Sequence, residues 1–439
     1  MTLALGGGTF ITQNKVLPGV YHNFISAARA FVNLSDRGYV ALPTELDWGP
    51  DGEVFTVTAE DLQKNSLKIF GYDYAHEKLK GIRDVFKNAH TAYIYRINEG
   101  AVAAQNTYGT AKYKGVRGNE LKTVIRANVD DPTKFDVLTY LDTTLVDEQT
   151  AVESAAELVD NDFVVWNKEA ALSETAGTPF TGGSNGTTPT ATPHQNALDE
   201  FESYGFNVLA CLTNDEAIKA LYVAYTKRMR DEVGAKFQLV GHNLGATDHE
   251  GVIDVHNKAT ELDYGLAFWV AGAQAGVAVN KSNTNKVYDG EYTVDFEGAK
   301  KQSELAELIK KGKYVLHRVG SDVRVLEDIN TFTSFTPEKN EDFSLNQVIR
   351  VLDQIAIDTA NLFNTRYLGQ VPNDQSGRVS LWNDIVSHRR ELQSIRAIEN
   401  FNPDDVKVEQ GNSKKAVVVN EAVEPTAAMS QLYITTVVA

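Results

Sequence analysis

Short apolar runs alternate with amphipathic stretches over much of the chain. Near the start, a helix-like stretch at 79–88 lies among strand-like runs at 38–43, 53–58 and 91–97. From residue 196 the alternation returns, with predicted helices at 196–203, 215–233 and 303–311 and predicted strands at 206–212, 237–240, 252–255 and 314–319. Strands that alternate with helices are typical of an α/β fold. We therefore expect one α/β domain in two parts, 25–100 and 196–335.

Between these two parts the pattern changes to short strands and turns. The strand-like runs are 109–114, 121–129, 135–141 and 163–166, and a helix-like stretch at 150–158 interrupts them. This pattern predicts a β-sandwich inserted at 101–176. Residues 177–193 are rich in Gly, Ser, Thr and Pro. We expect a solvent-exposed linker there, at 177–195.

The last hundred residues favour an α+β domain at 336–425. Ser344 and Gln347 are placed as a capping box for a first helix, with Phe343 and Val348 as a hydrophobic staple. One apolar stripe follows this helix: Leu345, Val348, Ile349, Leu352, Ile355, Ala356 and Leu362. A second helix is predicted at about 380–398, and strands are predicted at 406–408 and 416–419.

Both ends of the sequence are strand-like and too short to form a core. Residues 430–439 are dense in β-branched and aromatic side chains, and an apolar strand with a free edge invites aggregation. The strand therefore pairs within its own sheet, or it completes a sheet in another copy. At the other end, a glycine triplet (Gly6–Gly8) and a Pro18-Gly19 turn flank an extended segment at 9–17. Some 20 extended residues reach about 66 Å, far enough to cross onto a neighbouring subunit.

Several segments carry a resemblance to a known family. They are Leu-Gly-Gly-Gly-Thr-Phe at 5–10, Lys-Val-Leu-Pro-Gly-Val-Tyr-His-Asn-Phe at 15–24, Asp-Arg-Gly-Tyr-Val-Ala-Leu-Pro at 36–43, the stretch 201–243 and the final hundred residues. The sequence resembles contractile-tail sheath proteins of phages of Gram-positive bacteria, of PBSX-type prophages and of R-type bacteriocins. The resemblance covers essentially the whole chain, and it rests on the ordered set of segments because no single motif is diagnostic.

The resemblance implies an α/β domain of subtilisin-like topology with an inserted β-sandwich, a C-terminal α+β domain, and arms at 1–24 and 426–439. It implies stacked hexameric rings around a tail tube, and contraction that drives the tube through the bacterial envelope. The implied partners are other copies of the chain, the tube protein, and baseplate and tail terminator proteins. The implied locations are the bacterial cytoplasm during assembly and then the virion tail or bacteriocin particle. The residues expected to link subunits are Gly8, Thr9, Phe10, Ile11, Val16 and Leu17 in the first arm and Leu432, Tyr433, Ile434, Thr435, Val437 and Val438 in the last.

Composition agrees with this picture. The 439 residues are 42% hydrophobic and 23% charged, an ordinary globular composition that suggests about three domains. The single cysteine, Cys211, excludes an intramolecular disulfide and fits a reducing compartment. A net charge of −17 argues against broad nucleic-acid binding. Neither a signal peptide nor a membrane-spanning segment is apparent, since the apolar window at 266–279 is too short to span a bilayer.

Candidate chemistry is sparse. His242, His249 and His256 are seven residues apart, with Asp248, Glu250 and Asp254 beside them. Glycines between them argue against a helix that would align the three rings, so we expect solvated loop histidines and no metal site. No nucleophile elbow or phosphate loop is present, and we expect no catalytic residue and no cofactor. The alternatives are a soluble cytoplasmic metal-dependent hydrolase that uses this loop, or another self-assembling phage protein of a capsid or tube.

Four arginines are concentrated near the second C-terminal helix of this acidic chain: Arg378, Arg389, Arg390 and Arg396. One interpretation is a solvated helix face with Glu391 and Glu399 as local partners. The resemblance implies the other, in which the C-terminal domain faces the tail tube through complementary charge. Exposed ion pairs are individually weak, about 0–1 kcal/mol, which suits a contact that must release during contraction.

Overall fold

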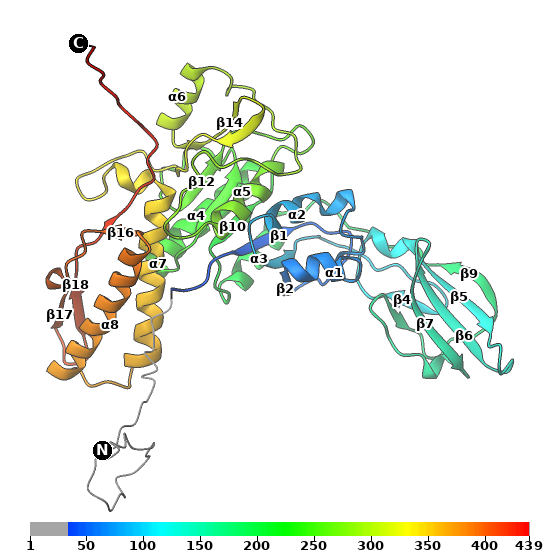
Figure 1. Ribbon diagram of the computed structural model, residues 1–439. Helices are drawn as coiled ribbons and strands as arrows, with labels where there is room; N and C mark the ends of the chain where they lie inside the picture. The colour runs from blue at the N-terminus through cyan, green and yellow to red at the C-terminus, as the bar shows by residue number, and fades with distance from the viewer. Residues whose placement is uncertain (1–33, 439) are drawn as a thin grey trace, which may run out of the picture.

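The structure, a computed structural model, describes residues 34–438. Its centre is an α/β domain, with a β-sandwich at one end and a pair of long helices at the other (Figure 1). The proposed linking residues of the N-terminal arm, Gly8 to Leu17, lie outside the described residues.

The central sheet has seven strands in the order β2-β3-β1-β10-β11-β12-β13. The strands are β1 (Tyr39–Thr44), β2 (Val54–Thr58), β3 (Thr91–Arg96), β10 (Val208–Cys211), β11 (Gln238–His242), β12 (Val252–Val255) and β13 (Lys313–Tyr314). All neighbours are parallel except β2, which is antiparallel to β3. The first strand, β1, thus lies inside the sheet and later strands are added on both sides of it, which brings the two predicted parts of the domain into one sheet.

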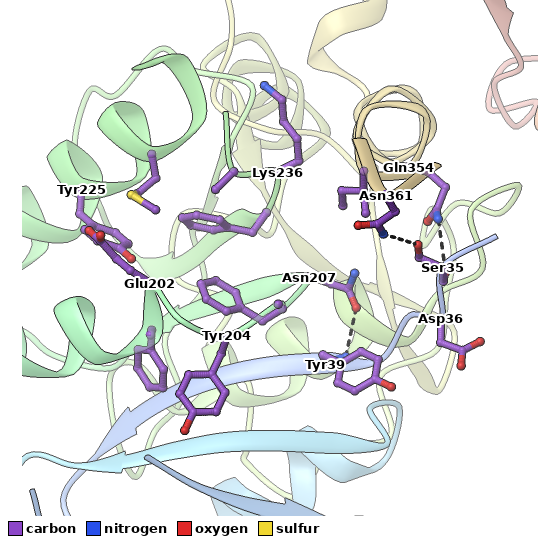
Figure 2. A pocket seen from close by; sticks show the side chains of 17 residues that line it. Ser35, Asp36, Tyr39, Glu202, Tyr204, Asn207, Tyr225, Lys236, Gln354 and Asn361 are labelled. Carbon is purple, nitrogen blue, oxygen red and sulfur yellow. Dashed lines mark hydrogen bonds between the residues drawn. The ribbon is translucent and has the colours of Figure 1, made fainter. Parts of the chain in front are cut away.

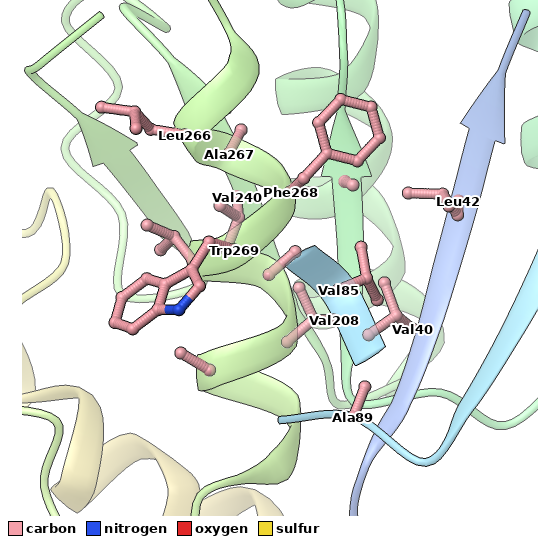
Figure 3. Packing of buried hydrophobic residues seen from close by; sticks show 14 of the residues in the cluster. Val40, Leu42, Val85, Ala89, Val208, Val240, Leu266, Ala267, Phe268 and Trp269 are labelled. Atoms are coloured by element: carbon pink, nitrogen blue, oxygen red, sulfur yellow. The ribbon is translucent and has the colours of Figure 1, made fainter. Parts of the chain in front are cut away.

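Helices cover both faces of this sheet. One face carries α1 (Ala59–Phe70), α2 (Lys80–Phe86) and α5 (Gly265–Gly276), and the other carries α3 (Ala191–Phe201) and α4 (Glu216–Arg228), which continues as a π-helical turn, Met229–Val233. Helix α5 is buried on all sides, and its residues Leu266 to Trp269 belong to one core cluster with Val40, Leu42, Val208 and Val240 of the strands (Figure 3). Its glycines let α2 approach closely, because a Cβ at Gly272 would lie 2.2 Å from the Val85 carbonyl oxygen.

The sandwich has a four-stranded sheet, β7-β6-β5-β9, beside a two-stranded one, β4-β8. Its strands are β4 (Gly109–Ala111), β5 (Leu121–Ala127), β6 (Phe135–Leu141), β7 (Thr144–Val152), β8 (Val164–Trp166) and β9 (Thr175–Pro179). Trp48, from the α/β domain, enters its core against Tyr113 and Phe163.

Two predictions for this region were wrong. The helix-like stretch at 150–158 is the end of β7 followed by one 3-10 turn, Ala155–Glu157, because strand pairing with β6 overrides local propensity. The expected exposed linker begins inside β9, buries Phe180, and makes β-bridges from Thr181, Ser184 and Thr187 back to residues 99–105. The return segment is therefore held against the sandwich.

The C-terminal region contains α7 (Asn346–Leu362), a π-helical turn (Phe363–Tyr367) and α8 (Gln375–Ser394). The short strands β16 (Ile398–Glu399), β17 (Lys407–Gln410), β18 (Val417–Asn420) and β19 (Glu424–Pro425) follow. The predicted capping box is wrong: Ser344 lies in a 3-10 turn, Glu341–Ser344, and α7 begins after Leu345 without a side-chain cap. Between β12 and α7 lie α6 (Gln302–Lys310), β14 (Leu316–Val319) and β15 (Asp322–Val325).

Candidate subunit interface

Helix α7 docks on the α/β domain through charged and amide side chains. Asp353 accepts two hydrogen bonds from Arg230, at 2.7 and 2.8 Å. Arg350 donates to Asp328 at 2.9 Å and to Gln274 at 2.7 Å, and both members of the Arg350–Asp328 ion pair are buried. Buried charges are tolerated when they are paired in this way, and removing one partner is costly. The polar face of α7 therefore points inward and fixes the helix.

As a consequence, part of the apolar stripe on α7 faces away from the domain. Leu352, Ile355 and Ala356 are only half-buried. Beside them an open groove of about 510 Å³ is lined by Ile355, Ala356, Thr359, Ala360, Phe363, Leu381, Ile385, Arg389, Val417, Val419 and Glu421. These residues come from α7 and the π-helical turn after it, from α8, and from β18 with the residue that follows it. The groove is thus an apolar surface that the described part of the chain leaves open.

Strand β18 borders this groove and has a free edge. It pairs on one side with β17, from Lys407 with Asn420 to Gln410 with Val417. Within residues 34–438 this sheet has two strands, so nothing described pairs with the other side of β18. Val417 and Val419 point into the groove, whereas Val418 is 43% exposed. A further strand beside β18 would lie over the half-buried stripe of α7.

The C-terminal arm leaves the body beside the first turn of α7, away from this sheet (Figure 1). Strand β19 pairs with β16, Thr426 donates its backbone N–H to Ala397, and Ala428 donates to Gln347. From there the chain runs away from the body to residue 438 (Figure 1). Its large apolar side chains are exposed: Leu432 83%, Tyr433 87%, Ile434 75%, Val437 86% and Val438 91%.

The expected terminal strand is not formed within this chain. Residues 430–438 have no regular secondary structure, and none of the described strands pairs with them. The sequence is strand-like, but its backbone lacks a partner here. Pairing within its own sheet, one of the two interpretations of this segment, is not what the structure shows.

The four arginines do not share one surface. Arg389 is 1% exposed and forms a bidentate ion pair with Glu421, at 2.9 and 2.7 Å, so it is not available to a tube. Arg378 is half-buried and donates to Asn373. Arg390 and Arg396 are exposed, and neither pairs with Glu391 or Glu399 among the ion pairs of residues 34–438. The prediction for Arg389 was wrong because the sequence does not reveal that Glu421 returns to α8.

The three histidines are less solvated than expected. His249 is buried and its Nε2 lies 3.1 Å from Asp231, while His242 and His256 are half-buried near the ends of β11 and β12. Burial lowers the pKa of all three. The expectation of solvated loop histidines was wrong, because the loop folds back onto the π-helical turn after α4.

Asp231, His249 and Glu250 are close enough to suggest a metal site. Two contacts oppose it. Gly251 donates its backbone N–H to His249 Nδ1 at 2.9 Å, so the ring proton of the neutral imidazole is on Nε2 and points to Asp231. Glu250 is already paired with Lys339 at 2.7 Å. A cation would have to displace both arrangements.

A second cavity, of about 340 Å³, lies between the α/β domain and α7 (Figure 2). It is lined by aromatic side chains, including Tyr39, Tyr204 and Tyr225, and by Lys236 and Gln354. It lies at the amino ends of β1, β10 and β11, whereas ligands of open α/β sheets bind at the carboxyl ends of the strands. Its position therefore does not favour a substrate pocket. No helix within residues 34–438 is long and apolar enough to cross a bilayer.

A closed sandwich at one end, and an exposed apolar arm and a separate open apolar groove in the C-terminal region, are typical of a structural protein that assembles with other copies. Comparison with known proteins identifies the family of this structural protein. Family models match as follows: the tail sheath protein Gp18 domain III N-terminal region at 37–97, the phage tail sheath β-sandwich domain at 96–185, the central domain at 187–331 and the C-terminal domain at 338–439.

Relatives agree over the whole length. The phage-like element PBSX protein XkdK of Bacillus subtilis is 32% identical over 98% of this chain and 99% of its own. The crystal structure of a sheath tail protein from Desulfitobacterium hafniense is 35% identical, with a TM-score of 0.81 over 95% of this chain and 99% of that one. The contracted helical sheath of the anti-feeding prophage shares the fold, with a TM-score of 0.53 at 16% identity over 96% of this chain and 99% of that one. The chain belongs to the phage tail sheath family and is a structural subunit of a contractile tail sheath.

Proposed function

We propose that copies of this chain are linked by strand addition, in which residues 430–438 of one copy pair with the free edge of β18 in another. The observation that carries the proposal is that one chain presents both an exposed apolar arm and an open apolar groove beside an unpaired strand edge. Donor and acceptor lie at different places on the surface, so each copy can donate to one neighbour and accept from another, and such a head-to-tail contact can extend into a helical assembly.

The chemistry of the two surfaces matches. Eight extended residues, such as 431–438, span about 26 Å and offer alternate side chains to the two faces of a sheet. Beside β18, the inward set would cover Ile355, Ala356 and Ala360 on α7. Main-chain hydrogen bonds would supply affinity, and the groove would select the side chains. The N-terminal arm, with Phe10, Ile11, Val16 and Leu17, is proposed to link a second neighbour in the same manner.

The proposed assembly is a stack of hexameric rings around a tail tube, with the baseplate and a terminator protein at its ends, formed in the bacterial cytoplasm. Contraction moves the subunits outward while the arms keep neighbours linked. Exposed Arg390 and Arg396 are the proposed tube contacts that remain after the exclusion of Arg389, with half-buried Arg378 beside them. The sandwich lies at the opposite end of the molecule from α8 and would face outward, away from the tube (Figure 1).

The α/β domain is proposed to have a subtilisin-like topology, supported by its mostly parallel strand order with β1 inside the sheet. We propose no catalytic role for it, since fold likeness alone implies no protease. The proposed divisions are 25–100 with 196–335 for this domain, 101–176 for the sandwich and 336–425 for the C-terminal domain.

Electron microscopy of the purified chain tests the proposal. Hollow filaments of uniform diameter are expected from the full chain, and their absence after removal of 430–439 from a folded protein. Filaments that persist without this segment would overturn strand addition by the C-terminal arm.

A further inference from the structure

A continuous chain of polar contacts, buried at its centre, links Ser35 with Glu421, which lies ahead of the C-terminal arm at 426–439; we refer to these two half-buried residues as the arm roots. At one end is Ser35, the second described residue, whose backbone N–H donates to Asp358 on α7 at 3.1 Å and whose hydroxyl donates to the same oxygen. Asp358 accepts from His388 on α8 at 2.8 Å. Arg389 donates to the other ring nitrogen of His388 at 2.6 Å and pairs with Glu421. Glu421 directly follows β18 and precedes the C-terminal arm.

The direction of each hydrogen bond in this chain is fixed by chemistry. A guanidinium has no acceptor, so Nδ1 of His388 must accept from Arg389 and carries no proton. The proton of the neutral ring is therefore on Nε2, from which it is donated to Asp358. Burial raises the pKa of Asp358, but hydrogen bonds from His388, Ser35 and Gln354 outweigh burial and hold that pKa below its usual value. His388 is satisfied by its two neighbours in this chain of contacts, whereas Asp358 also accepts from Gln354 and Arg389 also donates to Thr359.

Burial makes the arrangement sensitive to the loss of any member. Asp358 is 2% exposed, and His388 and Arg389 are each 1% exposed. A buried polar network is stable when every member is satisfied, and it weakens as a unit when one partner is lost. Neither helix offers Arg389 a second carboxylate among the ion pairs of residues 34–438.

We propose that Asp358, His388 and Arg389 are positioning residues that brace the roots of both terminal arms on the α7–α8 pair, so that loosening one root loosens the other. The meaning of this brace for a sheath rests on the proposed function, because load on one arm would then be shared with the other. The coupling itself is a property of the single chain and is measured there.

The test is hydrogen exchange at residue resolution on the full, unassembled chain carrying Glu421→Gln. This change keeps the shape of the side chain but removes the charge that pairs with Arg389. We expect exchange of the Ser35 amide to accelerate by about tenfold or more, although Ser35 does not touch Glu421. The amide of Tyr39 should be unchanged, because it donates to Asn207 outside this chain of contacts.

Glu424→Gln is the matched control. It makes the same charge change three residues later, at an exposed carboxylate that accepts from Asn400. His388→Gln, which can still donate to Asp358, should accelerate Ser35 less than His388→Ala. An unchanged Ser35 amide in Glu421→Gln, an equal acceleration at Tyr39, or an equal effect of Glu424→Gln would overturn the brace. None of these results bears on whether filaments form, so the brace and strand addition fail separately.

Discussion

The β-sandwich and the C-terminal region differ in how much of their apolar surface is buried within one chain. In the sandwich two sheets enclose Leu121, Ile125, Val137 and Phe163, and the return segment closes its base by β-bridges. In the C-terminal region a two-stranded sheet leaves one edge and the groove beside it open, and the arm exposes six large apolar side chains, from Met429 to Val438. The sandwich is thus complete in one chain, whereas the C-terminal region presents apolar surface that, under the proposed strand addition, another copy would cover.

Removing residues 430–439 should have the largest effect on this contrast. The segment contributes little to the core of its own chain, so the truncated protein should stay monomeric with a Tm within about 2 °C of the full chain. Filaments should be absent in micrographs. The paired change Ile434→Asp and Val438→Asp should act alike, since it places charges where the ladder is buried. A much lower Tm of the truncated monomer in calorimetry would instead mean that the arm stabilises its own chain.

A charge in the groove should weaken assembly strongly. Ala360 is exposed in the single chain, so Ala360→Asp should leave the monomer folded while burying an unpaired carboxylate once a strand covers it. We expect the critical concentration for filament formation, measured by sedimentation, to rise at least about tenfold. Val165→Asp, at an exposed valine of the sandwich, is the control and should change it little. If both variants raised the critical concentration equally, the groove would not differ from the sandwich as a subunit contact.

Reversing the charge of the two exposed arginines should lower the affinity for the tube moderately, by an amount that depends on salt. Exposed ionic contacts contribute about 0–1 kcal/mol each, so at about 0.7 kcal/mol for each arginine, Arg390→Glu with Arg396→Glu should weaken binding to the purified tube about tenfold at low salt. The difference should shrink as salt is raised, because screening acts on exposed charges. Lys122→Glu with Lys134→Glu makes the same charge change on the sandwich. A similar loss from that control would indicate a general effect of net charge.

Excising the sandwich should have the smallest effect on assembly. Glu99 and Thr187 form a β-bridge, so residues 100–186 can be replaced by a two-residue Asn-Gly turn. Trp48 should become Ser in the same variant, because its indole would lose Tyr113 and Phe163. Filament yield in micrographs should stay within about twofold of the full chain, since neither arm nor groove is altered. A soluble, folded excision variant without filaments would show that the sandwich also carries subunit contacts.

The sequence predicted elements well where local pattern and tertiary contacts agree. The predicted strands 38–43, 53–58, 91–97 and 252–255 correspond to β1, β2, β3 and β12, and the predicted helices 215–233 and 380–398 overlap α4 and α8. Helix α1 was missed, although Thr58 and Asp61 form a capping box that signals its start. Residues 150–158 were predicted as a helix because local propensity does not register the pairing of β7 with β6.

By itself, the sequence determined the order of segments, the α/β alternation, the inserted sandwich and the strand-like character of its last residues, because each depends on local composition and period. Only the tertiary structure decided which side of each element is used. It turned the polar face of α7 inward through Asp353 and Arg350, and it buried Arg389 against Glu421, 32 residues away. It also left the outer edge of β18 and residues 430–438 without strand pairing inside residues 34–438. These outcomes depend on pairs of residues that lie far apart in sequence, and a pattern read along the chain carries no information about which of them meet.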